Sequence, residues 1–339
     1  MNIYDISEKA GVSIATVSRV LNGNSRVSEK TREKILRVIE ETGYQPNVFA
    51  RGLGKNTMST IGILCADSSD LVLSSALYHV EQELQKYEYN ALLCCTGYDY
   101  QAKAKYTGLL LYQKVDALIY VGSNFVEQEA EKNQYILDAA KEVPVMIVNG
   151  YLKAPNVYCT VCDDRNIVRR VTAPFLEKTD RILFLSWFLS YSARQKILGF
   201  RDALEEKGAV WSEDRVLVCG DSVDGVCEAL QERWAGGARW DVIMAANDEL
   251  AIAARKFALR QGIHVPNELQ IVGYNNSRVS HFCEPELTSI ANHLDLASRE
   301  AVRLLMRLLS GEKEQIPGKV TIPCELIVRG TTGDLSQDL

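Results

Sequence analysis

Histidine is scarce in this sequence, and long apolar runs are missing. The 339 residues include only four histidines, and these are dispersed, so they offer no cluster for a metal centre. No apolar run near the start is long enough for a signal peptide or a membrane span. We therefore expect a cytoplasmic protein that has no membrane contact and no metal site.

Motifs of common catalytic sites are also absent. No GxGxxG follows a predicted strand, and neither a Walker A sequence nor a GxSxG elbow occurs. Two acidic pairs, Asp67 with Asp70 and Asp163 with Asp164, stand where strands should end and helices begin. At such positions helix capping explains carboxylates better than acid–base catalysis does. We expect no enzyme activity, no catalytic residue and no cofactor.

The nine cysteines are an odd number, and most lie in apolar, strand-like runs. This distribution is typical of reduced, buried thiols. Cys159 and Cys162 form a lone CxxC, but in an extended strand their side chains point to opposite faces. Without a second pair or a histidine at ligand spacing, we interpret them as structural.

Charge is distributed unevenly along the chain. The net charge is −6, yet residues 1–58 carry nine Lys and Arg against six Asp and Glu, and the remainder carries 29 against 38. A basic N-terminal segment on an acidic body favours a local attraction to nucleic-acid phosphates.

The N-terminal segment has the pattern of a helix-turn-helix. Apolar residues recur at helical spacing after Asn2, a possible N-cap, and Gly11 permits a sharp turn. A second helix, capped by Ser13, would bury Val17, Val20 and Leu21 and leave an outer face with little acidic character. Two short helices joined by a glycine turn are typical of DNA-binding domains.

A third helix and a short hinge should follow. Ser28 can cap a helix to about residue 42, with Gly43 at its end and a buried face of Ile35, Leu36, Val38 and Ile39. Residues 46–53 would form about one and a half helical turns, too short to be stable alone. We expect this hinge helix to order only when two copies meet DNA.

From residue 59 onward, apolar strands alternate with amphipathic helices. Strands are predicted at residues 60–66, 91–95, 117–122, 145–149, 182–186, 216–219, 242–246 and 270–274. Helices are predicted, among others, at residues 73–89, 193–207 and 249–261. Strands buried on both faces and joined by helices indicate an α/β core of doubly wound parallel sheets.

The sequence blocks resemble those of the lactose-repressor (LacI/GalR) family. The stretches YDISEKAGVSIATVSRVLNG and SEKTREKILRVIEETGYQPNVFARGL resemble its headpiece, and TIGILCADSSD, AANDELAIAA and VPNELQIVGYNNSR resemble blocks of its core. The resemblance covers about residues 2–332 and is closest to the catabolite-control type. It implies a helix-turn-helix headpiece (1–45), a hinge (46–58) and a periplasmic-binding-protein-like core (59–333), followed by a tail (334–339). The core would comprise an N-subdomain (about 59–161 and 292–322) and a C-subdomain (about 162–291 and 323–333).

The resemblance also implies the DNA-contacting residues. Arg19 can read guanine in the major groove, and Leu53 would wedge between central base pairs from the minor groove. The expected DNA-binding residues are Ser13, Ile14, Ala15, Thr16, Ser18, Arg19, Asn22, Asn47, Ala50, Arg51 and Leu53. The partner would be a palindromic double-stranded operator bound by a homodimer.

A small effector is expected where strands end, in the cleft of the core. Polar amides, a cation and aromatic faces suit a sugar, sugar phosphate or sugar acid. The candidates are Ser69, Asp70, Val72, Ser123, Trp187, Phe188, Arg194, Asp221, Asn247, Asn275 and Asn292. Arg194 could instead form a surface salt bridge, Trp187 and Phe188 could instead close the core, and Asp248 is interpreted as a helix cap.

Two departures from the family pattern concern this site. Asn275 stands where relatives usually carry aspartate, and Val72 with Leu73 replace paired aromatics. An amide both donates and accepts hydrogen bonds, whereas a carboxylate only accepts, so an anionic ligand becomes easier to accommodate.

The sequence thus predicts a transcriptional regulator of carbohydrate genes, most often a repressor in this family. Two alternatives stay open: a solute-binding protein without DNA function, and a global regulator controlled by a protein co-effector.

Overall fold

The computed structural model describes residues 2–21, 26–44, 57–220, 222–312, 316–333 and 335. The chain divides into two compact units, Met1–Thr60 and Ile61–Leu339. We call the first unit the headpiece and the second the core. The predicted hinge helix at residues 46–53 lies outside the described residues.

The headpiece contains the helices α1 (Ile3–Ala10), α2 (Ile14–Leu21) and α3 (Glu29–Thr42). The Asn2 side chain accepts hydrogen bonds from the backbone N–H groups of Tyr4 and Asp5, and Asp5 accepts one from Asn2 in return. This capping box begins α1. The helix ends at Gly11, whose backbone adopts the left-handed conformation with φ 61°. The predicted cap and turn are therefore confirmed.

The headpiece core is built from Ile6, Ala10, Val17, Val20 and Ile35, all buried. Two expectations about the third helix were wrong. Leu36 is 49% exposed, because the adjacent Ile35 already occupies the inward direction of α3. The Ser28 hydroxyl bonds to the Thr31 hydroxyl and makes no capping bond to the backbone.

The described strands of the core form two six-stranded sheets. In order across the first sheet they are β11 (Lys319–Ile322), β5 (Val157–Cys162), β4 (Val145–Val148), β3 (Ala117–Val121), β1 (Thr60–Cys65) and β2 (Asn90–Cys95). In order across the second they are β12 (Glu325–Ile327), β10 (Thr288–Ala291), β9 (Gln270–Tyr274), β8 (Val242–Ala245), β6 (Ile182–Ser186) and β7 (Val216–Val218).

Helices cover both faces of each sheet. On the first sheet, α5 (Leu71–Gln85) and α12 (Leu294–Leu309) pack on one face, and α6 (Tyr100–Tyr112) and α7 (Gln134–Glu142) pack on the other. On the second, α8 (Asp164–Leu176) and α9 (Tyr191–Glu206) pack opposite α10 (Val223–Ala235) and α11 (Asp248–Arg260). The predicted doubly wound α/β architecture is confirmed.

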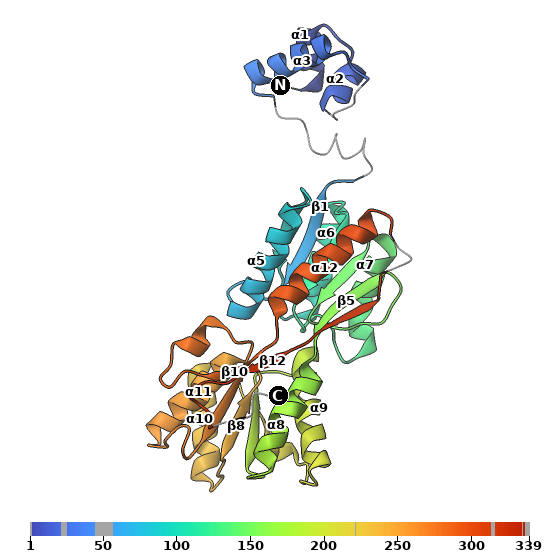
Figure 1. Cartoon of the computed structure of the whole chain (residues 1–339). Coiled ribbons are helices and arrows are strands. Elements are labelled where there is room, and N and C mark those ends of the chain that lie inside the picture. The colour runs from blue at the N-terminus through green and yellow to red at the C-terminus, as the bar shows by residue number, and fades with distance from the viewer. Residues whose placement is uncertain are drawn as a thin grey trace. The chain divides into compact units, whose positions relative to one another are not determined.

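The chain passes from one sheet to the other after β5, after β10 and between β11 and β12. As a result α12, late in the sequence, lies beside α5, which follows the first strand (Figure 1). We call the layers around the first sheet the N-subdomain and those around the second the C-subdomain.

Pairing is parallel at most of the described ladders, but β12 runs antiparallel to β10. The expectation of strands buried on both faces holds for β3 and β4 and is wrong for β2, whose residues are largely exposed. Strand β2 forms the edge of its sheet, where neighbouring layers cannot cover it. No helix among the described residues is long and apolar enough to cross a membrane.

Candidate functional site

The outer face of α2 presents the residues expected to read DNA bases. Ser13, Ile14, Ala15 and Arg19 are exposed, and Thr16 and Ser18 are half-buried. The Ser13 hydroxyl accepts a hydrogen bond from the Thr16 backbone N–H at 3.2 Å, which supports the first turn of the helix. Asn22, Asn47, Ala50, Arg51 and Leu53 lie outside the described residues.

A pocket lies in the core between the two subdomains. It holds about 700 Å³ of space between atoms, part of it open to solvent. The N-subdomain lines it with Asp70, Val72, Leu73, Tyr98, Ser123, Asn124, Asn149 and Leu294. The C-subdomain lines it with Ser186, Trp187, Phe188, Ser190, Ser192, Ala193, Lys196, Ala246, Asn247, Leu250 and Asn275.

Most of the effector residues predicted from the sequence line this pocket. They are Asp70, Val72, Ser123, Trp187, Phe188, Asn247 and Asn275. Asn292 lies just behind the wall and hydrogen-bonds Asn275, and Asp221 is outside the described residues. Ser69 is not in the lining, because its hydroxyl and backbone N–H both bind Asp67 instead.

Lys196 lines the pocket, whereas Arg194, the cation expected from the sequence, is not among the lining residues. Residues two apart on a helix are separated by a rotation of about 200° around the helix axis. Their side chains therefore point in nearly opposite directions, and only one of the two can face the cleft. Lys196 lines the pocket, whereas the Arg194 guanidinium donates to the Leu189 carbonyl at 2.5 Å. The rotation of α9 about its axis decides which of the two cations faces the pocket, and Lys196 belongs to its buried stripe with Ala193 and Phe200.

Close packing of two helices fixes that rotation. A Cβ on Gly199 would lie 2.1 Å from the carbonyl oxygen of Arg165, so α9 approaches α8 at a distance only glycine permits. Arg165 also binds Asp202 with two hydrogen bonds, of 2.6 and 2.9 Å, across the same helix pair. These contacts hold the face carrying Lys196 toward the pocket.

A buried polar cluster lies beneath Lys196. The ammonium donates to the Ala246 carbonyl at 2.8 Å and lies 3.6 Å from the centroid of the Tyr274 ring. Asp164, nearby and buried, accepts hydrogen bonds from Ser192 and Tyr274. Burial lowers the pKa of Lys196 and raises that of Asp164, while their opposite charges act against both shifts.

Two asparagines form a relay at the C-subdomain wall. The Asn292 side-chain oxygen accepts from the Leu294 backbone N–H at 3.4 Å, at the start of α12. Its amide nitrogen then donates to the side-chain oxygen of Asn275 at 2.9 Å. The relay links the pocket wall to a helix of the N-subdomain.

Asn247, and not Asp248, caps α11. The Asn247 side-chain oxygen accepts from the Leu250 backbone N–H at 2.9 Å. Asp248 is buried instead and accepts from Ser277 and Ser289, so its predicted capping role was wrong. Its pKa is raised by burial, and the hydrogen bonds partly offset that shift.

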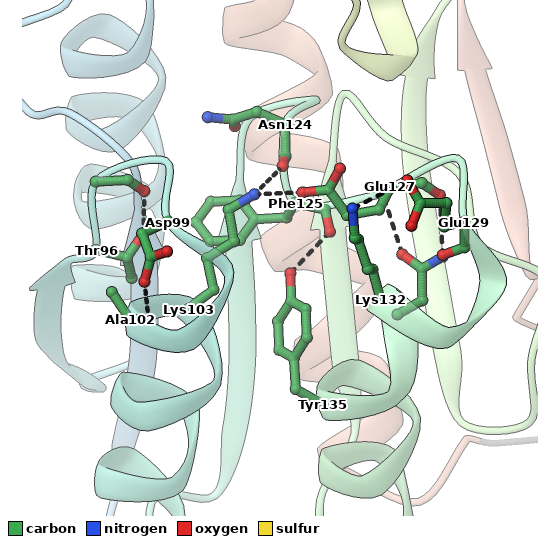
Figure 2. Close-up of polar contacts among 12 residues, drawn as sticks. Thr96, Asp99, Ala102, Lys103, Asn124, Phe125, Glu127, Glu129, Lys132 and Tyr135 are labelled. Atoms are coloured by element: carbon green, nitrogen blue, oxygen red, sulfur yellow. Dashed lines mark hydrogen bonds and ion pairs between the residues drawn. The ribbon is translucent and has the colours of Figure 1, made fainter.

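Lys103 fixes the loop that follows β3. Its side chain is 2% exposed, and its ammonium donates to the Asn124 carbonyl at 2.6 Å and to Glu127 at 2.7 Å (Figure 2). The Tyr135 hydroxyl donates to the Phe125 carbonyl within the same loop (Figure 2). These bonds give the loop a defined shape where it enters the pocket.

The same loop contacts the C-subdomain. The Ser123 hydroxyl donates to the Ser190 hydroxyl at 2.9 Å, and the Ser123 carbonyl accepts from the Tyr191 backbone N–H at 3.2 Å. Beside this contact, the rings of Tyr98 and Phe188 lie 5.5 Å apart, one from each subdomain. The walls of the pocket therefore touch directly at one side.

Comparison with known proteins agrees with the sequence resemblance. Residues 2–47 match the model for bacterial regulatory proteins of the lacI family, and residues 180–332 match a periplasmic binding protein-like domain. An HTH-type transcriptional regulator of Lachnoclostridium phytofermentans is 47% identical over 98% of this chain and 99% of its own length.

The chain belongs to the lacI family. Within it, catabolite control protein A of Priestia megaterium is 29% identical over 92% of this chain and 93% of its own, which agrees with the resemblance to the catabolite-control type. A solved transcriptional regulator, CelR in complex with cellobiose, is 25% identical with a TM-score of 0.71 and covers 98% of this chain and 99% of its own.

Membership of this family makes the chain a DNA-binding transcriptional regulator. The matched headpiece sets aside the alternative of a solute-binding protein without DNA function. The core keeps the architecture of a binding protein, and its pocket residues come from strand ends of both subdomains.

Several pocket residues were missed by sequence reasoning, namely Tyr98, Asn149, Ser186, Ser190, Ser192, Ala193, Lys196, Ala246, Leu250 and Leu294. Asn149 stands at the end of the strand predicted at residues 145–149, so the rule that ligands bind at strand ends could have found it. Tyr98 lies in the loop that follows the strand predicted at residues 91–95, so the same rule points to this loop.

Proposed function

We propose that this regulator binds an operator through α2 as a dimer and is controlled by a small carbohydrate-like effector in the pocket of the core. The observation that carries the proposal is the composition of the pocket, which takes side chains from both subdomains. The complex of the CelR relative with cellobiose supports a carbohydrate as the ligand.

The chemistry of the lining supports the same class of ligand. Amide and hydroxyl groups can fix ring hydroxyls, and Trp187, Phe188 and Tyr98 offer apolar faces for a sugar ring. We infer that the pocket binds its ligand without converting it, since the relatives are named as regulators. A regulator of this kind acts in the cytoplasm, where the chromosome is.

Control would work through the relative position of the subdomains. A ligand that touches both walls binds one degree of closure more tightly than another, and it shifts the population accordingly. A tenfold difference in affinity between two closures corresponds to about 1.4 kcal/mol. The Ser123–Ser190 contact is one that a ligand would strengthen or displace.

On the headpiece, the exposed face of α2 would enter the major groove. We propose that Ile14, Ala15 and Arg19 read bases, with Ser13, Thr16 and Ser18 positioned to support contacts nearby. The hinge residues, including Asn47, Ala50, Arg51 and Leu53, remain sequence-based assignments to the minor groove.

Selection of binding sites from random DNA with the purified chain tests this function. We expect a near-palindromic site, and we expect at least one carbohydrate to change the affinity for that site in fluorescence anisotropy. Binding without sequence preference would contradict operator recognition. An operator affinity that responds only to an added protein fraction would favour control by a protein co-effector.

A further inference from the structure

The orientation of the Asn275 amide is fixed by its surroundings. Asn292 must turn its oxygen toward the Leu294 backbone N–H, because that group can only donate. Asn292 therefore offers its nitrogen to Asn275, which must answer with its oxygen. The amide nitrogen of Asn275 is the group left for a ligand in the pocket, and it is a donor.

Three other polar groups of the C-subdomain wall also have hydrogen-bond donors left for a ligand. Asn247 uses its side-chain oxygen to cap α11, so its remaining group is the NH₂ donor. Lys196 uses one N–H on the Ala246 carbonyl and faces the Tyr274 ring, which leaves a further N–H for a ligand. The indole N–H of Trp187 is buried and has no hydrogen-bond partner among the described residues.

The N-subdomain wall offers acceptors. One carboxylate oxygen of Asp70 caps α5 through the N–H groups of Val72 and Leu73, so the second oxygen remains. The side-chain oxygen of Asn149 is buried and lacks a hydrogen-bond partner among the residues that the structure describes. Donors on one wall thus oppose acceptors on the other.

We propose that the effector is an anionic carbohydrate, such as a sugar acid or a sugar phosphate. Its anionic group binds the donors Lys196, Asn275 and Asn247, and its hydroxyls donate to Asp70 and Asn149. This inference rests on the proposed function, because it names the chemical class of ligand for the same pocket.

A neutral sugar matches this pocket less well. Its hydroxyls can accept from the donor wall, but they carry no negative charge to attract Lys196, whose nearby opposite charge is the buried Asp164. An anionic acceptor makes charge-assisted hydrogen bonds with the neutral donors Asn275 and Asn247, and such bonds are roughly twice as strong as neutral ones, so the anionic group should dominate selectivity. A carboxylate or phosphate also accepts several hydrogen bonds at once, which matches a wall with several separate donors.

Matched pairs of ligands test the inference. Calorimetry on the full chain would compare glucose with glucuronate and glucose 6-phosphate, and galactose with galacturonate and galactose 6-phosphate. We expect the preferred acid or phosphate to bind at least tenfold more tightly than its neutral partner. The two anionic arms distinguish a carboxylate from a phosphate ligand.

Variants of single residues test which side chains cause the preference for the anionic ligand. Lys196→Met should reduce the preference for the anion to less than threefold, whereas Arg201→Met, which removes an exposed cation from the same helix, should leave it unchanged. Asn275→Asp places an acceptor in the pocket, so it should weaken the anionic ligand and strengthen the neutral sugar.

The possible outcomes separate this inference from the proposed function. Equal or tighter binding of the neutral sugar by the wild-type chain would overturn the inference and leave a carbohydrate effector in place. A preference for the anion that survives Lys196→Met would overturn the role of this wall. Failure of every carbohydrate to bind or to change operator affinity would overturn the proposed function itself.

Discussion

Replacing Lys103 with methionine should destabilise the core although Lys103 lies outside the pocket lining. Methionine keeps most of the aliphatic body but removes the ammonium that binds the Asn124 carbonyl and Glu127. Leaving a partly buried acceptor without its donor costs up to about 1–3 kcal/mol. Glu127 is 32% exposed and can be hydrated, so its lost ion pair adds less than about 1 kcal/mol.

The loss is partly offset because methionine avoids the burial of a charge, so we expect a net destabilisation of about 1–3 kcal/mol. Lys132→Met is the control. Lys132 also pairs with a glutamate of this region, Glu129, but their side chains are 46% and 65% exposed (Figure 2). Its loss should change stability by less than about 0.5 kcal/mol.

Urea unfolding of the full chain, followed by tryptophan fluorescence, measures both variants. The four tryptophans of the sequence all lie in the core, so the signal reports on that unit. Ligand affinity should also fall in Lys103→Met, because the loop that it holds carries Ser123 and Asn124 into the pocket. Equal stability of the two variants would refute the assignment of Lys103 as the support of this loop.

Three further predictions concern the DNA interface and one surface ion pair. Arg19→Ala should weaken operator binding by about 1–3 kcal/mol and spare random DNA, and equal losses on both in fluorescence anisotropy would reduce Arg19 to a phosphate contact. Leu53→Ala, in the hinge expected from the sequence, should reduce operator bending in a gel-phasing assay, and an unchanged bend would contradict a wedge. The hydrogen bonds from Arg165 hold the pKa of Asp202 below its ordinary value. The pair therefore stabilises the fold fully above about pH 4, and this stabilisation is lost as the pH falls through the lowered pKa. Asp202→Asn should therefore be less stable than the wild type by up to about 1 kcal/mol at pH 7, and the difference should shrink as the pH falls through the lowered pKa of Asp202. A difference in thermal unfolding that does not change with pH would argue against this linkage.

The sequence alone determined the first two helices of the headpiece, because their structure depends on contacts between residues close in the chain. The Asn2 cap, the Gly11 turn and the spacing of Val17 and Val20 specify α1 and α2 without reference to the core. The alternation of apolar strands and amphipathic helices likewise determined the doubly wound sheets, because the spacing of apolar residues in each segment indicates which of its faces is buried. The position of Asn275 and Asn247 at strand ends then placed them in the pocket.

Only the tertiary structure decided which atom of each amide faces the pocket. The donor state of Asn275 depends on Asn292, which lies 17 residues away in sequence and is itself oriented by the start of α12. Such choices depend on contacts between elements that are distant in the chain, and the periodicity of any one segment carries no information about them.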